Sequence, residues 1–300
     1  MLSQVLGIGL QQIKEHGFLS GFLGEETRIC RYSASSPSKQ MTRKGLKMLP
    51  HEALKNALEK SEESALVAFL TAGYPEPKNF LNVLYDVSEA ADAVEIGVPF
   101  SDPMADGVTI QRSSQAAIEH GVSLSWILDQ LGSRTIKSNT PLLLMSYLNP
   151  LLAFGFDDLA SRALQVGVSG FIIPDLPYEE SMLLKTSLDK VGIALIQLVT
   201  PATPSIRLNE ICQASQGFVY AVTRTGITGS ATQFPADLAD YLAAVKEAAK
   251  VPVCAGFGVR KSEQVRMISK HADGVIVGSA LVEALERGEN PGEFLRNLRP

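Results

Sequence analysis

The sequence predicts a single-domain α/β protein, a (β/α)8 or TIM barrel over residues 49–300, preceded by an N-terminal extension, residues 1–48. Short apolar runs recur from residue 49 onward, and each is followed by a polar turn and a segment with helical periodicity. Most runs are spaced by about 22–34 residues, which is typical of one βα unit. Eight such units in about 250 residues favour a parallel sheet closed into a barrel.

The predicted strands are the eight apolar runs, at residues 65–71, 93–96, 142–146, 170–173, 193–198, 218–221, 253–255 and 274–277. The gap between the second and third runs is longer, about 49 residues, and is predicted to hold a loop and two helices. The loop covers residues 97–107, and the helices cover residues 108–120 and 124–132. An open doubly wound sheet is the alternative fold for the same pattern.

The helices between strands are predicted from apolar stripes that would face the sheet. Two helices, one before the fourth strand and one before the seventh, illustrate the pattern. Their predicted buried faces consist of Leu159, Ala163, Leu164 and Val166, and of Leu238, Tyr241, Leu242 and Val245.

Charge and hydropathy exclude several classes of protein. The formal net charge is −5 at pH 7, so no strong positive field would attract nucleic acid or anionic lipid. No apolar run approaches the roughly 20 residues that a membrane-spanning helix needs. We therefore expect a soluble, cytoplasmic protein without nucleic-acid or membrane partners.

The cysteines and histidines form no disulfide or metal-ligand pattern. Cys30, Cys212 and Cys254 lie far apart and include no CxxC pair, which favours a reducing compartment. The four histidines are equally scattered, and His120 and His271 are expected at helix ends. No metal site is predicted.

The extension, residues 1–48, differs in composition from the rest of the chain. It has seven Lys and Arg residues and three acids, a net of +4, against −9 for residues 49–300. Residues 31–45 are rich in Ser and basic residues, like a linker or the tail of an organelle transit peptide, although the acids count against the latter. A plastid location is the alternative if it is a transit peptide. Translation starting at Met41 or Met48 is a further alternative.

Three glycine-marked segments follow the sixth, seventh and eighth predicted strands, at residues 228–230 (TGS), 256–258 (GFG) and 278–279 (GS). Active sites of such barrels lie at the C-terminal strand ends, and the loops after strands seven and eight often bind phosphate. Glycine lets backbone N–H groups approach an anion, and a helix beginning near residue 278 adds a favourable dipole. These segments contain no lysine, so the backbone would bind the phosphate. Ordinary turn glycines are the alternative.

The second predicted strand and its loop supply the acidic candidates. Strand side chains alternate, so Glu95 points into the barrel if Val94 and Ile96 pack on the helices. A buried carboxyl without a purpose is costly, and burial favours its neutral form, which suits proton transfer. The alternative is a Glu paired with a hidden Arg or Lys, but the predicted strands contain neither. Asp106 follows in a loop restricted by prolines, whereas Asp102 is interpreted as a structural brace of that loop.

Residues 95–111 (EIGVPFSDPMADGVTIQ) resemble the signature of the tryptophan synthase alpha subunit family. Further landmarks agree in order and spacing, at residues 69–75 (FLTAGYP), 145–150 (MSYLNP), 174–177 (PDLP), 224–229 (RTGITG), 256–258 (GFG) and 278–279 (GS). The resemblance covers roughly residues 49–300. Two departures are Leu148, where relatives often carry another residue such as Tyr, and the extension, which the bacterial family lacks.

The resemblance implies a role for each candidate residue. Glu95 and Asp106 match the two catalytic carboxylates of the family. The positions that match the indole and glycerol pocket are Phe69, Tyr147, Tyr220, Thr228 and Phe257. The positions that match the phosphate-binding backbone are Gly229, Gly258, Gly278 and Ser279.

The implied activity is that of a lyase, which splits indole-3-glycerol phosphate into indole and glyceraldehyde 3-phosphate in L-tryptophan biosynthesis. No metal or organic cofactor is expected; pyridoxal phosphate is expected only in the partner beta subunit of an α2β2 complex. Alternatives are a stand-alone lyase of secondary metabolism and a non-catalytic activator of the beta subunit. Other phosphate-binding barrel enzymes would need a strand-end lysine, a catalytic histidine or clustered metal ligands, which are missing from the predicted strand ends.

Overall fold

The computed structural model describes residues 48–61, 64–136, 138–223, 237–256 and 258–299. The chain divides into two units, Met1–Leu46 and Lys47–Pro300, and every described residue belongs to the second unit. The predicted extension, residues 1–48, therefore lies outside the described residues apart from Met48.

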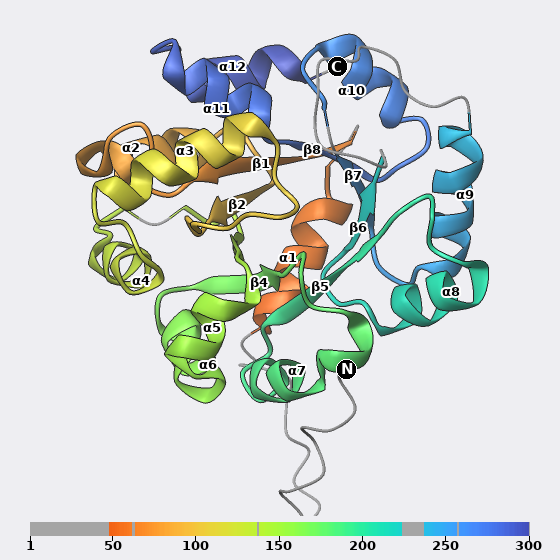
Figure 1. Ribbon diagram of the computed structural model, residues 1–300. Helices are drawn as coiled ribbons and strands as arrows, with labels where there is room; N and C mark the ends of the chain where they lie inside the picture. The colour runs from red at the N-terminus through yellow and green to blue at the C-terminus, as the bar shows by residue number, and fades with distance from the viewer. Residues whose placement is uncertain (1–47, 62–63, 137, 224–236, 257, 300) are drawn as a thin grey trace, which may run out of the picture. The chain divides into compact units, whose positions relative to one another are not determined.

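Within these residues, eight parallel strands form a closed barrel in chain order (Figure 1). The barrel closes where β1 pairs with β8, with Ala65 opposite Gly274. The predicted barrel is confirmed, the open sheet is wrong, and no predicted strand end is displaced by more than two residues. The strands are β1 Ala65–Thr71, β2 Ala93–Gly97, β3 Leu142–Met145, β4 Val168–Ile172, β5 Ala194–Val199, β6 Val219–Val222, β7 Val253–Gly256 and β8 Gly274–Val277.

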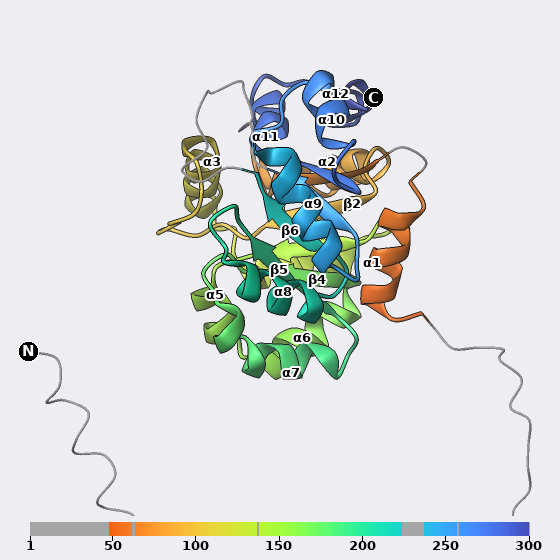
Figure 2. The same cartoon turned by 90° about the vertical axis from the view of Figure 1, so that its right-hand side faces the viewer.

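Helices surround this barrel (Figure 1, Figure 2). The long segment between β2 and β3 holds the two predicted helices, α3 and α4, and none of the described helices is long and apolar enough to cross a membrane. The helices are α1 Pro50–Glu59, η1 Pro77–Asn79, α2 Phe80–Ser88, α3 Val108–Glu119, α4 Leu124–Ser133, α5 Leu148–Phe154, α6 Phe156–Gln165, η2 Tyr178–Glu180, α7 Met182–Asp189, α8 Ser205–Ala214, α9 Leu238–Ala248, α10 Ser262–Ile268, α11 Ser279–Glu286 and α12 Pro291–Leu298.

The helix α1 covers the N-terminal end of the barrel. Its Leu54 and Leu58 belong to the same buried cluster as the interior side chains of Val67 and Leu143. Gly217, just before β6, makes room for this helix, because a Cβ there would lie 2.6 Å from Leu54 Cδ2. The C-terminal end of the barrel is thus the end left for a site.

The alternation of side chains along β2 decides which of them face the barrel interior. Val94 and Ile96 belong to the cluster between the sheet and the helices, whereas Ala93 belongs to the interior cluster. Glu95 alternates with Val94 and Ile96 and therefore points inward, as predicted.

One predicted buried residue is wrong. Leu159, Ala163 and Val166 are buried as expected, but the Leu164 side chain is 43% exposed. Each helical residue is rotated by about 100° from the one before it, so Leu164 turns away from the face that Leu159 and Ala163 share. The predicted stripe of α9 is confirmed, with Leu238, Leu242 and Val245 buried and Tyr241 partly buried against the core.

Candidate active site

A pocket opens inside the C-terminal end of the barrel, and seven of the predicted site residues, from widely separated segments, line it. The space between its lining residues is about 500 Å³, including the open solvent at its mouth. Its lining combines two carboxyls, an apolar wall and four small residues, three glycines and a serine. The lining residues are Phe69, Glu95, Asp106, Gly107, Ile110, Met145, Tyr220, Gly258, Ile276, Gly278 and Ser279.

Glu95 is completely buried, and its side chain lines this pocket. Neither carboxyl oxygen has a hydrogen-bond partner among the described residues. The alternative, a Glu paired with a hidden Arg or Lys, is therefore not supported within this part of the chain. Burial without compensation raises the pKa of Glu95 from 4.5 to about 8. The group therefore holds its proton at neutral pH and can give it to a bound molecule.

Asp106 lies in the loop between β2 and α3, on the wall of the same pocket. Its Oδ2 accepts a hydrogen bond from the Tyr147 hydroxyl at 3.1 Å, and that hydroxyl accepts one from the Ala105 N–H at 2.9 Å. The Phe100 ring stacks on Tyr147 with centroids 5.0 Å apart. Burial raises the pKa of Asp106, and the Tyr147 hydrogen bond opposes that shift.

Tyr147 itself, one of the predicted substrate-binding residues, lines a smaller hollow that adjoins the pocket and shares Phe69, Asp106 and Met145 with it. Tyr147 begins α5 as its N-cap, directly after β3. The structure thus places Tyr147 behind Asp106, where its hydroxyl orients the carboxylate.

Phe69 of β1 and Tyr220 of β6 are both buried and contribute to the apolar wall. Burial, and next the negative charge of Glu95, raises the pKa of Tyr220 well above its usual value, so the phenol stays neutral. The pocket is also lined by four residues that were not predicted from the sequence, Gly107, Ile110, Met145 and Ile276. Strand alternation predicts an inward side chain at Ile276, because it lies two residues before Gly278, the candidate that directly follows β8.

Two of the predicted phosphate-binding glycines, Gly258 and Gly278, line the pocket. Gly258 follows β7 with φ +81°, and a Cβ there would meet no atom of the described residues within 4 Å, so open space lies beside its backbone in the pocket. Gly278 is the N-cap of α11, and Ser279 is its first residue, as predicted. No Lys or Arg from the described residues lines this pocket. Thr228, Gly229 and Phe257 lie outside the described residues.

The two remaining sequence features lie away from the pocket lining. Asp102 is exposed and accepts a hydrogen bond from the Ser101 hydroxyl, consistent with its interpretation as part of the loop structure. Leu148 packs partly buried against the core, and its N–H donates to the Asp175 carboxylate at 2.9 Å. The departure at Leu148 therefore concerns local packing at the start of α5.

A closed barrel whose open end holds a buried and a half-buried carboxyl, an apolar wall and pocket-lining glycines belongs to the class of barrel proteins suited to acid–base chemistry on a small, largely apolar molecule. Comparison with known proteins identifies the family within that class.

The family model described as tryptophan synthase alpha chain matches residues 55–298. A tryptophan synthase alpha chain from Nitratidesulfovibrio vulgaris is 42% identical over 233 residues, covering 77% of this chain and 91% of the relative. One from Carboxydothermus hydrogenoformans is 43% identical over 225 residues, covering 75% and 84%.

Solved structures agree with the sequence relatives. Tryptophan synthase subunit alpha from Legionella pneumophila superposes with a TM-score of 0.73 at 32% identity, covering 84% of this chain and 98% of that one. A chain of the tryptophan synthase complex from Pyrococcus furiosus gives a TM-score of 0.71 at 36% identity, covering 79% and 97%. The chain belongs to the tryptophan synthase alpha chain family.

Proposed function

We propose that this chain cleaves indole-3-glycerol phosphate to indole and glyceraldehyde 3-phosphate, the alpha reaction of L-tryptophan biosynthesis. The observation that carries the proposal is the presence of Glu95 and Asp106 on one apolar pocket that also includes Gly258 and Ser279. Family membership supports the same reaction.

The pocket can accommodate each part of this substrate. The apolar indole ring would lie against Phe69 and Tyr220, close to both carboxyls. The phosphate would bind backbone N–H groups near Gly258 and at the first turn of α11, where the helix dipole favours an anion. By the family resemblance, Thr228 and Phe257 would add to the ring pocket and Gly229 to the phosphate site. The phosphate does not react, and its binding energy positions the reacting end.

The reaction is a retro-aldol cleavage, and its atoms balance without an added reagent. The indole C3 gains a proton, and positive character develops at N1. The bond between C3 and the hydroxyl-bearing carbon then breaks, and its electron pair returns to the ring. The hydroxyl becomes a carbonyl as its proton leaves to a base, so one proton has moved from oxygen to carbon.

Glu95 fits both proton transfers. Because its pKa is raised to about 8, the carboxyl is protonated at neutral pH and can deliver its proton to C3. The resulting carboxylate can then remove the hydroxyl proton, which restores the starting state. Low exposure keeps water from competing in either step.

Asp106 fits the electrostatic role. A carboxylate that accepts a hydrogen bond from N1–H stabilises the positive charge that grows there. The Tyr147 hydroxyl, which donates to Oδ2, favours the ionised form and leaves the other carboxylate oxygen for the substrate.

This chemistry needs no metal or organic cofactor. We propose a tryptophan synthase beta subunit containing pyridoxal phosphate as the partner, in an α2β2 complex, because indole is apolar and escapes easily from solution. The Pyrococcus furiosus neighbour comes from a tryptophan synthase complex, which supports a partner of this kind. The expected location is cytoplasmic, with a plastid as the alternative if residues 1–48 are a transit peptide.

The test is indole release from indole-3-glycerol phosphate by the purified full chain, followed by chromatography with and without the cognate beta subunit. The parent should release indole, whereas Glu95→Gln should lose roughly a thousandfold or more in kcat while retaining substrate affinity. Glu95→Gln activity within about tenfold of the parent would remove Glu95 as the proton carrier. A parent that releases no indole under either condition would contradict the proposed function.

A further inference from the structure

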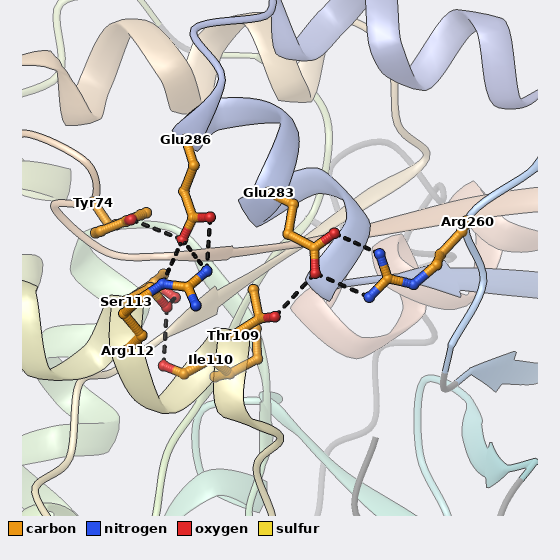
Figure 3. A network of polar contacts seen from close by, with 9 residues as sticks. Tyr74, Thr109, Ile110, Arg112, Ser113, Arg260, Glu283 and Glu286 are labelled. Atoms are coloured by element: carbon orange, nitrogen blue, oxygen red, sulfur yellow. Dashed lines mark hydrogen bonds and ion pairs between the residues drawn. The ribbon is translucent and has the colours of Figure 1, made fainter. Parts of the chain in front are cut away.

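Glu283, on α11, joins three segments that contribute to the pocket, although its own side chain does not line it (Figure 3). It lies four residues, about one turn, after Ser279. Its carboxylate accepts hydrogen bonds from Thr109 of α3 and from Arg260, which follows β7. The carboxylate thus connects the helix that begins at Ser279 to the loops that carry Asp106 and Gly258.

The first connection fixes the start of α3. Thr109 is nearly buried, at 8% exposure, and its hydroxyl donates to Glu283 Oε1 at 3.0 Å. Thr109 is the second residue of α3, and the two residues before this helix, Asp106 and Gly107, line the pocket. A hydrogen bond at Thr109 therefore limits how far the Asp106 carboxylate can move from α11.

The second connection fixes the loop after β7. Both terminal nitrogens of the Arg260 guanidinium donate hydrogen bonds to the Glu283 carboxylate, and Nη2 lies 2.9 Å from Oε1. The Arg260 N–H also donates to Gln264 Oε1 at 2.8 Å, so the backbone of this residue is held as well. Gly258 is only two residues earlier. The ion pair lowers the pKa of Glu283, and the carboxylate stays charged at neutral pH.

A neighbouring carboxylate provides an internal comparison. Glu286, three residues along α11, accepts a two-nitrogen hydrogen bond from Arg112 of α3 and another from the Tyr74 hydroxyl at 2.9 Å. This second ion pair also joins α11 to α3 (Figure 3). Its partners in the described chain include no residue of the loop that carries Gly258.

We propose that Glu283 is a positioning residue: its carboxylate holds Asp106, through Thr109, and Gly258, through Arg260, in fixed relation to the first turn of α11. This inference rests on the proposed function, because it assigns the two held segments to the reacting ring and to the phosphate. A displacement of about 1 Å at a reacting group can cost up to a hundredfold in rate. The three hydrogen-bonded donors supply that rigidity from outside the pocket.

The two contacts of Glu283, with Thr109 and with Arg260 (the Arg260 arm), should have separable kinetic effects on indole release. Thr109→Val, which keeps the shape and removes the hydroxyl, should lower kcat about tenfold while KM stays within about twofold. Arg260→Gln should raise KM about tenfold with kcat within about threefold. Glu283→Ala should show both effects, and Glu286→Ala, the matched control on the same helix, should change neither by more than about threefold.

Two further variants test the arrangement itself. Glu283→Gln keeps an acceptor oxygen for Thr109 but loses the charge that holds Arg260, so kcat should recover while KM stays raised. Combining Thr109→Val with Glu283→Ala should lower kcat no further than Glu283→Ala alone, because both remove the same contact. Additive losses, or equal effects of Glu283→Ala and Glu286→Ala, would overturn the positioning role.

Binding of inorganic phosphate, measured by calorimetry, tests the Arg260 arm without the reaction. Arg260→Gln and Glu283→Ala should weaken phosphate binding about tenfold, whereas Thr109→Val and Glu286→Ala should leave it within about twofold. If the parent cleaves no indole-3-glycerol phosphate but this pattern holds, the proposed function fails and the role of Glu283 at the phosphate loop stands. Phosphate binding by Glu283→Ala as tight as by Glu286→Ala would overturn it.

Discussion

The Tyr147 hydroxyl donates a hydrogen bond to Asp106 Oδ2 at 3.1 Å and joins two loops that are 41 residues apart in the chain. The Tyr147 hydroxyl oxygen also accepts a hydrogen bond from the Ala105 N–H, so Tyr147 holds both the carboxylate and the backbone next to it. The orientation of Asp106 thus depends on a residue that follows β3, not on its own loop alone.

Tyr147→Phe should move the acid limb of the kcat/KM profile to higher pH. The hydroxyl stabilises the carboxylate form, so its removal leaves burial to raise the pKa of Asp106 further, and the proposed role requires the ionised form. The measurement is kcat/KM for indole release between pH 5 and pH 9. Tyr241→Phe removes a hydroxyl that donates to the Val199 carbonyl and should leave the acid limb in place. Equal profiles for both variants would exclude the role of Tyr147.

Asp106→Asn should be severely impaired but less so than Glu95→Gln, because an amide oxygen still accepts a hydrogen bond from N1–H without supplying the charge. A loss of about a hundredfold in kcat is expected, of the size found for removal of one electrostatic group. Steady-state kinetics of Asp106→Asn and Asp106→Ala provide the check. Normal turnover by Asp106→Ala would show that the carboxylate has no part in the reaction.

The free energy of unfolding should fall as pH rises from 4.5 to about 8. Glu95 has a pKa of about 8 in the folded protein and 4.5 when exposed, so the folded state binds more protons over this window. The contribution of the protonated Glu95 carboxyl to the free energy of unfolding is full below pH 4.5 and is lost as pH rises through 8. Over this window the free energy of unfolding falls by up to about 1.4 kcal/mol per pH unit. Denaturant unfolding at several pH values gives the free energy of unfolding, which should depend less on pH in Glu95→Gln than in the parent. The same pH dependence in both proteins would contradict the raised pKa.

Gly258→Ala should raise KM for indole-3-glycerol phosphate about tenfold, because Gly258 lines the pocket and an added methyl group would take up open space beside the proposed phosphate site. Gly121→Ala is the matched control: Gly121 has φ +79°, and an added Cβ there also meets no atom of the described residues within 4 Å. Both substitutions should cost about 1 kcal/mol or more of backbone strain. Equal KM values for the two variants would show that the phosphate binds elsewhere. A crystal soaked in sulfate provides a second test, and an anion bound away from Gly258 and Gly278 would contradict the proposed phosphate site.

Addition of the cognate beta subunit should raise the rate of indole release without supplying a catalytic group. Asp106 lies on a loop, so a partner that binds the barrel mouth and favours the loop's productive conformation would increase turnover. Steady-state cleavage is measured with increasing beta subunit, and mass measurement gives the stoichiometry. A chain that is already fast alone and does not bind the beta subunit would favour a stand-alone lyase.

The barrel and the position of Glu95 were predictable because they depend on local periodicity. Strand side chains alternate, so the apolar Val94 and Ile96 assign Glu95 to the interior before any contact is known. The absence of Lys and Arg from the predicted strands likewise indicated an unpaired carboxyl, and its two oxygens lack partners among the described residues. Leu164 marks the limit of this approach, since one step along a helix moved an apolar side chain off the buried face.

Contacts between loops required the tertiary structure. Tyr147 beside Asp106, and Thr109 and Arg260 on the Glu283 carboxylate, each join residues brought together only when the barrel closes. No periodicity encodes such pairs, because their separations in the chain, such as 174 residues between Thr109 and Glu283, are set by the βα units between them. The sequence alone determined the strands, the inward carboxyl and the family resemblance, while closure of the barrel decided which side chains contact Asp106 and the loop that carries Gly258.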